Sequence, residues 1–316
     1  MLRYTLRRLV AAAFVVLLVL VLLAALVQIL PGDPVTLMLG PRADPALIPI
    51  ARQQMDLDSS VPAQIWHFLV GVAHGNLGQD FLTKRPVSEL IGAALPHTLI
   101  LATVSLALAV VLAVPLAVVS AARQGTWLDR LLATASIGII SIPSYVIGMV
   151  GLLVATVWLG TLPAIGTGSL SDPLDYAAHL VLPTLSLALI WAGYLARLLR
   201  SSLLEVLGEN YVRAARAYGV PEWRVYCQIA LREAIPGVVA LIGVALGDLM
   251  GSAVFIEVIF TRNGLGIALY NAVAERDYPI IRGGVVVIAV LFVLANLLAD
   301  LANRAINPRL SEEAVR

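Results

Sequence analysis

The sequence is poor in cysteine, lysine and charge, and each shortage excludes a class of function. Its single cysteine, Cys227, cannot form a disulfide within the chain, and the paired spacings typical of zinc sites are missing. Its only lysine, Lys84, lacks the glycine-rich frame of a phosphate-binding loop, in which a lysine reaches the terminal phosphates. We therefore expect no redox site and no ATP site on this chain.

The low charge points to a bilayer as the solvent. Charged residues make up 13% of the chain and apolar ones 60%, whereas soluble domains average about 25% and about 45–50%. The formal net charge of +1 provides no broad basic field for nucleic acid. We predict an integral membrane protein that does not bind nucleic acid.

Six apolar runs are long enough to cross a bilayer as helices. A hydrocarbon core of about 30 Å requires about 20 mostly apolar residues, and a helix satisfies its own backbone hydrogen bonds. Prolines inside two of the runs, Pro115 and Pro143, predict kinks, and the third run is long enough to tilt or break. We predict an all-α, polytopic bundle of six membrane helices forming a single domain, residues 1–316. The runs cover residues 9–30, 98–119, 131–159, 180–199, 237–260 and 283–302.

The first run could also belong to a secretory signal peptide, because basic residues precede it. However, the apolar part of a signal peptide has about 7–15 residues, and no small-residue cleavage pattern follows residues 9–30. We expect an uncleaved first span.

Arginine placement predicts the orientation, because short loops rich in Arg and Lys stay in the cytoplasm. With the N-terminus inside, fourteen of the 21 Lys and Arg side chains are cytoplasmic, and both termini lie there. The outer segments are then a folded cap, residues 31–96, and the loops 160–179 and 261–282. The seven outer basic residues are Arg42, Arg52, Lys84, Arg85, Arg262, Arg276 and Arg282.

The longest inner segment, residues 200–236, is too polar to span but carries apolar residues at helical spacing. Its alanine-rich part predicts a helix that Gly219 and then Pro221 end. Such small side chains allow another surface to approach closely. The alternative is an amphipathic helix on the inner leaflet, with Arg213 and Arg216 toward the headgroups.

A second helical stretch follows in the same segment. It covers residues 222–233, and we expect it to end at Pro236, because proline removes a helix hydrogen bond. The inner segment would then hold two short helices.

The inner segment resembles the cytoplasmic loop of permease subunits of ABC importers. That loop carries Glu-Ala-Ala, three residues, Gly, nine residues, then Ile-x-Leu-Pro. Arg213 replaces the glutamate and Arg232 the proline, and these departures fit the dipeptide, oligopeptide and nickel branch, to whose typical sequence residues 201–219 are similar. The matching positions are Ala214, Ala215, Gly219, Ile229 and Leu231.

The resemblance to that branch extends along nearly the whole chain. Each short motif is weak alone, but together with the loop they occur in the family's order. They are LPGDP (30–34), GNLG (75–78), SIPS (141–144), NGLG (263–266), RDYP (276–279), NLLAD (296–300) and NPR (307–309).

The resemblance implies a type I importer-like transmembrane domain in the bacterial inner membrane, as the first permease of a pair. It implies as partners a second homologous permease, one or two ABC ATPase subunits that bind ATP and Mg, an extracytoplasmic solute-binding protein, and membrane lipid. The chain itself would have no catalytic residues and no cofactor. Peptides are the expected substrate, with nickel, glutathione or another small solute as alternatives.

The same resemblance implies site residues. The inner helix, about residues 207–220, would sit in a groove of the ATPase, and the loop 263–266 would face the binding protein. The expected coupling residues are Glu209, Tyr211, Arg213, Ala214, Ala215, Arg216 and Gly219. The expected binding-protein contacts are Asn263, Gly264, Leu265 and Gly266.

Intramembrane charges are costly and point to function. Glu257 and Asp300 lie near span ends, where side chains reach the interface, so we expect structural roles. Asp248 lies near the middle of the fifth span, with Ser252 one turn later on the same face. We take Asp248, Ser252 and Tyr145 as pathway or gate candidates; a hydrogen bond between helices is the alternative for Asp248.

Three other functions are weaker. A secondary transporter driven by an ion gradient is the alternative from a different class, but no inverted repeat is visible. A membrane-anchored enzyme lacks a legible catalytic set. His67 and His74 are seven residues apart, yet two imidazoles without a third ligand make a poor metal site, so we expect none.

Overall fold

The computed structural model describes residues 10, 13–22, 35, 46–54, 56–80, 83–163, 165–169 and 171–306. These residues form two compact units. The first combines Met1–Thr98 with Arg262–Val293, and the second combines Leu99–Thr261 with Leu294–Arg316. In the described residues, regular structure is helical apart from one isolated antiparallel bridge, Gln79 to Pro86. The predicted all-α class is therefore confirmed.

Four described helices are long and apolar enough to cross a membrane, and a bent pair would make a fifth span. The bent pair is α6 (Trp127–Ile140) and α7 (Ser144–Leu152), continued by the π-helical turn η1 (Leu153–Trp158). The four helices are α5 (Val87–Ala122), α8 (Pro173–Leu207), α11 (Leu231–Ile259) and α13 (Tyr278–Ile306).

Proline has different effects in two of the predicted spans. The pair α6 and α7 bends by 95° at the break that contains Pro143, which has ψ 144 and lies directly before α7. Proline lacks an N–H donor and disfavours helical geometry in the residue before it, which explains a break there. In contrast, α5 continues through Pro115 as an uninterrupted helix.

The first predicted span, residues 9–30, is described only in part. The described part is a short apolar helix, Ala13–Leu22, on which Phe14 and Leu22 are more than half exposed. Apart from Val10, the rest of this run lies outside the described residues, as do the motifs 30–34 and 307–309.

The end predicted at Pro236 is wrong. After α10 (Glu222–Arg224), the chain forms a π-helical turn, η2 (Val225–Ala230), and continues directly into α11. Pro236 removes one hydrogen bond from α11, but Ala234 and Val238 on either side of it are buried. Packing on both sides of the proline explains why the helix continues.

The first unit has a small apolar core. It contains α3 (Leu47–Gln54), α4 (Val61–Ala73), α12 (Leu265–Glu275) and the beginnings of α5 and α13. The Leu265 amide, at the start of α12, donates a 2.7 Å hydrogen bond to the buried Thr98 hydroxyl. Gly283 of α13 packs so closely that a Cβ there would lie 2.8 Å from a methyl of Val87. The buried core residues are Val87, Ile91, Leu265 and Leu269.

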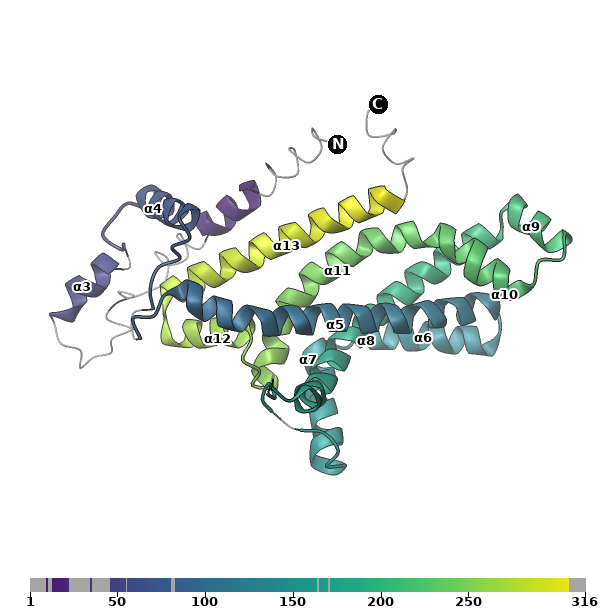
Figure 1. The fold of residues 1–316 in the computed structure, drawn as a ribbon. Helices are drawn as coiled ribbons and strands as arrows, with labels where there is room; N and C mark the ends of the chain where they lie inside the picture. Colours follow the sequence, from purple (N-terminus) through teal and green to yellow (C-terminus); the bar gives the residue numbers. More distant parts are fainter. Residues whose placement is uncertain are drawn as a thin grey trace. The chain divides into compact units, whose positions relative to one another are not determined.

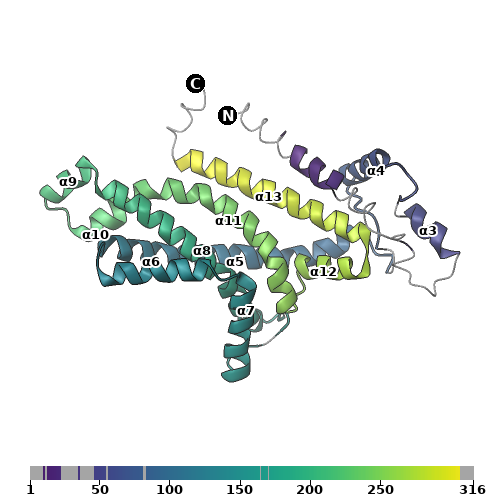
Figure 2. The same cartoon turned by 180° about the vertical axis from the view of Figure 1, so that it is seen from behind.

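The second unit is built around α8. Helices α6, α7 and α11 all pack against it, and α6 lies beside it in both views (Figure 1, Figure 2). Glycines allow the close contacts: a Cβ at Gly193 would lie 3.2 Å from the Ser136 carbonyl oxygen of α6, and one at Gly148 of α7 would lie 3.2 Å from the Ser186 hydroxyl. Small residues thus bring these helices together, as is common in membranes.

Candidate coupling loop and pathway residues

The predicted inner helix exists as α9 (Asn210–Ala217). Together with α10 it lies near the C-terminus of α8 and the N-terminus of α11, away from α7 (Figure 2). It packs against α8 and η2. One apolar side chain anchors it, because Val212 is completely buried. The helix is shorter than the predicted range 207–220, since Gly208 and Glu209 separate it from α8.

A Schellman motif closes α9 at its C-terminal end. The Gly219 amide donates to the Arg216 carbonyl at 2.9 Å, and the Val220 amide donates to the Ala215 carbonyl at 3.1 Å. Gly219 has a φ of +77°, a left-handed conformation that glycine adopts without steric cost. The predicted helix end at Gly219 is therefore observed, and it fixes how the chain leaves α9.

The outward face of α9 presents both charge and small side chains. Tyr211 is 48% exposed, and Arg213 and Ala214 are exposed, whereas Ala215 and Arg216 are half-buried. Glu209 is exposed and caps the helix through its backbone alone. The small side chain of the exposed Ala214 leaves room for the surface of another protein to approach between the polar side chains around it.

Two arginines are held by the loop itself. Arg216 makes a two-pronged ion pair with Glu222, with Nε–Oε1 at 2.9 Å and Nη2–Oε2 at 3.2 Å. The Glu222 carboxylate raises the pKa of Arg216 above its ordinary value, so this guanidinium stays charged. Arg213 donates to the Gly208 carbonyl at 3.1 Å. These bonds orient both side chains along the loop.

Sequence reasoning missed two exposed aromatic residues beside α9. Tyr218 is 90% exposed, and Trp223 is 57% exposed with the Arg224 guanidinium 5.2 Å from its ring centre. Both residues stand in the polar inner segment of the sequence, and exposed apolar side chains that gather in one place mark interaction sites.

It also missed a buried ion pair that ties α6 to α8. Arg200 of α8 donates to both carboxylate oxygens of Asp129 at 2.8 Å, and Ser120 adds a 2.6 Å hydrogen bond. Asp129 is 5% exposed and stands three residues after Thr126, whose hydroxyl caps α6. This spacing is a capping signature that the sequence contained, but the partner 71 residues away was not visible.

The pathway candidates Asp248 and Tyr145 have different partners. Asp248 is exposed on α11, and its carboxylate accepts a 3.1 Å hydrogen bond from the indole N–H of Trp191 on α8. Ser252 is half-buried one turn later, and Tyr145 of α7 contacts Phe255 instead, with 6.3 Å between ring centres. The hydrogen bond between helices considered for Asp248 is thus present, and sequence reasoning missed its donor, Trp191.

The other charged positions differ in burial. Glu257 of α11 is completely buried, whereas the side chain of Asp300 lies outside the described residues. Just before α12, Asn263 is exposed, but the cap residue Gly264 and the first two residues of the helix, Leu265 and Gly266, are buried. Of the four predicted binding-protein contacts, only Asn263 therefore presents its side chain at the surface of its unit.

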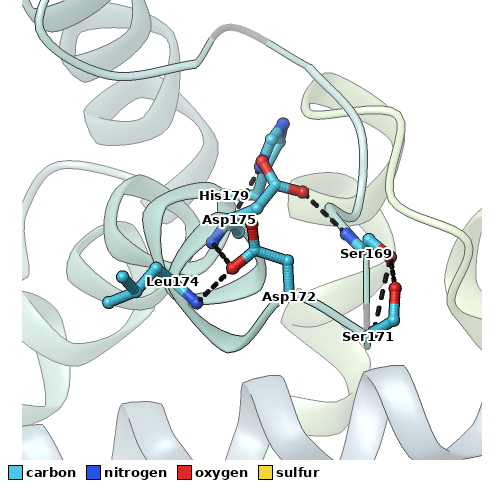
Figure 3. Close-up of polar contacts among 6 residues, drawn as sticks. All are labelled: Ser169, Ser171, Asp172, Leu174, Asp175 and His179. Carbon is cyan, nitrogen blue, oxygen red and sulfur yellow. Dashed lines mark hydrogen bonds and ion pairs between the residues drawn. The ribbon is translucent and has the colours of Figure 1, made fainter.

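A polar cluster fixes the start of α8 (Figure 3). The Asp172 carboxylate accepts from the amides of Leu174 and Asp175 at 3.0 and 3.3 Å, and the Asp175 carboxylate accepts from the Ser169 amide at 2.7 Å. Gly168 has φ +73°, and a Cβ there would lie 2.8 Å from the Tyr176 Cα. The backbone of this loop therefore packs directly on the first turns of the helix.

The two histidines considered for a metal have separate partners. His67 lies 2.8 Å from the Asp56 carboxylate, and His74 lies 2.8 Å from the Val70 carbonyl. Among the described residues, no group of three His, Cys, Asp or Glu could hold a metal ion.

Two family models match the sequence. Residues 113–312 match the family described as binding-protein-dependent transport system inner membrane component, and residues 1–102 match the N-terminal part of such a component. The chain belongs to this family. This binding-protein-dependent transport component is therefore a multi-pass inner-membrane permease, and the resemblance to permease subunits of ABC importers is confirmed.

Similar proteins cover almost the full length of this permease. The glutathione transport system permease protein GsiC of Pectobacterium atrosepticum is 38% identical over 308 residues, 98% of each chain, and that of Escherichia coli K12 is 36% identical with equal coverage. Both relatives are permease proteins by name. The family assignment thus holds for both ends of the chain.

Solved structures share the fold of the permease. An inward-facing methionine ABC transporter, MetNI, matches with a TM-score of 0.58 and 23% identity, over 69% of this chain and 96% of the other. An amino acid ABC transporter with histidines matches with a TM-score of 0.52 and 16% identity, over 75% and 98%.

Proposed function

We propose that this permease forms the translocation pathway of an ABC importer for peptide-type solutes delivered by a solute-binding protein. Relatives that are 36–38% identical are named as glutathione transport permeases, and glutathione is itself a small peptide. Dipeptides, oligopeptides and glutathione therefore form one substrate class for this chain, with nickel or another small solute as the alternative. The pathway would be shared with a second, homologous permease.

In this proposal six spans cross the membrane and both termini are cytoplasmic. The arginine distribution supports this orientation, with the loop of residues 200–236 in the cytoplasm and the cap of residues 31–96 outside. The loop that exposes Asn263 would then face the binding protein. Together, residues 1–316 act as one transmembrane domain.

Helix α9 is the proposed contact with an ATPase subunit. The observation that carries this role is its combination of a buried anchor, Val212, an exposed face around Ala214 and a closed end at Gly219. A short helix held in this way moves as one piece with whatever binds it. ATP and Mg would be bound by the ATPase subunits, whose closure biases the spans between two packings.

Disulfide cross-linking tests this contact. In a Cys227→Ser background, Ala214→Cys should cross-link to a cysteine placed along the groove of the ATPase subunit in the assembled transporter. Ala274→Cys is the matched control, because Ala274 is also an exposed helical alanine but lies on α12. It should not cross-link.

The leaflet alternative predicts the opposite result. If α9 lay on the inner leaflet, a lipid-soluble maleimide would label Ala214→Cys as fast in the assembled transporter as in the isolated chain, and no cross-link would form. That outcome would refute docking on the ATPase.

A further inference from the structure

The exposed face of α11 carries one charge among apolar and aromatic residues. Val244, Asp248, Gly251 and Phe255 follow one another by four, three and four residues, so they share a face of the helix. All four are exposed, and a Cβ at Gly251 would meet nothing within 4 Å. Asp248 lies near the middle of the apolar stretch Leu241–Ile259.

The carboxylate of Asp248 is oriented but not neutralised. The Trp191 indole, which is 8% exposed, donates to Oδ2, and an indole N–H carries no charge. Within the described part of the chain, no basic side chain forms an ion pair with Asp248. A charged group at this depth faces a water-filled cavity or a cation rather than lipid.

The ring that binds this carboxylate belongs to an aromatic pair. Trp191 packs on Tyr194, with ring centres 5.6 Å apart, and Tyr194 is 39% exposed. Aromatic faces attract ammonium groups through the negative charge of their ring faces. A carboxylate held beside such rings matches a primary ammonium group in both charge and shape, whereas a transition metal would require further ligands.

We propose that Asp248, with Trp191 and Tyr194, binds the primary ammonium group of the substrate during its passage through the pathway. This inference rests on the proposed function as a peptide-type permease, and it adds which end of the substrate the pathway recognises. Trp191 is the positioning residue, since its N–H fixes the carboxylate, and Asp248 supplies the charge.

The test uses the complete transporter in nanodiscs without its binding protein, so that only the pathway can discriminate. The probes are Ala-Ala and N-acetyl-Ala-Ala, which differ in the ammonium group, and binding is measured by saturation-transfer NMR. The wild-type complex should bind Ala-Ala at least about tenfold more tightly than the acetylated form. The reason is that a hydrogen bond to a charged group contributes at least the free energy that corresponds to a tenfold change in affinity. Asp248→Asn should remove this preference, and Trp191→Phe should weaken it.

Glu275→Gln is the control, because it removes one negative charge from an exposed position on α12. It should leave the preference unchanged. Equal binding of the two probes by the wild type would overturn the inference without any variant. The inference would also be overturned if Asp248→Asn kept the preference for Ala-Ala but no longer co-purified with the second permease. In that case Asp248 would pair with a cation of that subunit.

ATP hydrolysis stimulated by the binding protein separates this inference from the proposed function. A transporter that responds to its binding protein but does not distinguish the two probes contradicts only the ammonium site. One that never responds contradicts the importer itself.

Discussion

At the scale of single residues, Gly219 shows how a backbone conformation can matter without any contact. Its φ is +77°, yet a Cβ there would meet nothing within 4 Å. Any cost of substitution therefore comes from the left-handed conformation and not from a clash.

We expect Gly219→Val to uncouple ATP hydrolysis from uptake while the complex still reaches the membrane. The left-handed conformation costs a β-branched residue about 1–2 kcal/mol or more. The Schellman motif would therefore open, and the direction of the chain after α9 would no longer be fixed. Uptake and ATPase rates in proteoliposomes measure this. Gly138→Val is the control, because Gly138 of α6 has the same open surroundings without a positive φ; normal uptake by Gly219→Val would refute the role of the turn.

The Asp129–Arg200 pair makes a second prediction at this scale. Asp129→Asn leaves the Arg200 guanidinium without its counter-charge, and we expect a loss of stability of about 2–4 kcal/mol, at the lower end because Arg200 is 27% exposed. A lowered midpoint of thermal unfolding of the solubilised complex would show it.

The double variant Asp129→Leu with Arg200→Met separates charge from packing. Since apolar replacement of a buried pair is often neutral, it should recover most of the midpoint. If the double variant were less stable than Asp129→Asn, the pair would stabilise the unit by more than charge compensation.

At the scale of elements, the sequence predicts which spans exist better than where they end. The apolar windows 98–119 and 180–199 lie inside α5 and α8, but these helices begin at Val87 and Pro173. A hydropathy window selects the part in lipid, whereas caps such as Asp172 decide where the helix begins. The continuation of α11 through Pro236 depends on tertiary packing, which local sequence does not encode.

The start of α8 offers a prediction about an element. Gly168→Ala should loosen the first turns of α8, because the new Cβ would lie 2.8 Å from the Tyr176 Cα. Faster hydrogen exchange of the amides after Pro173 measures this effect. Gly160→Ala is the control, since Gly160 also has a positive φ but open space around it; equal exchange rates in the two variants would assign the effect to φ alone.

At the scale of the whole molecule, family membership was predictable because short motifs recur in order along the chain. The pairs Trp191–Asp248 and Arg200–Asp129 were not, because each joins residues more than 50 positions apart. Local periodicity says which face of a helix is polar but not which helix it meets. The sequence therefore predicted candidate residues by type, whereas contacts such as that of Trp191 with Asp248 became visible only in the structure.

A prediction at this scale concerns the chain alone. Reconstituted without ATPase subunits, it should show no solute uptake driven by a proton or sodium gradient, because coupling is proposed to pass through α9. Uptake of radiolabelled Ala-Ala into liposomes with an imposed gradient checks this. Accumulation under those conditions would favour the secondary transporter.

The length of α8 has a mechanical consequence. Its 35 residues extend for roughly 50 Å at about 1.5 Å per residue, whereas the hydrocarbon core is about 30 Å thick. Even when tilted by about 40°, the rod would be longer than this core. About two turns or more of α8 must therefore lie outside the hydrocarbon core, and in the proposed orientation α9 follows directly after the cytoplasmic end of this long helix, so that a displacement of α9 would be passed along α8 as along a lever.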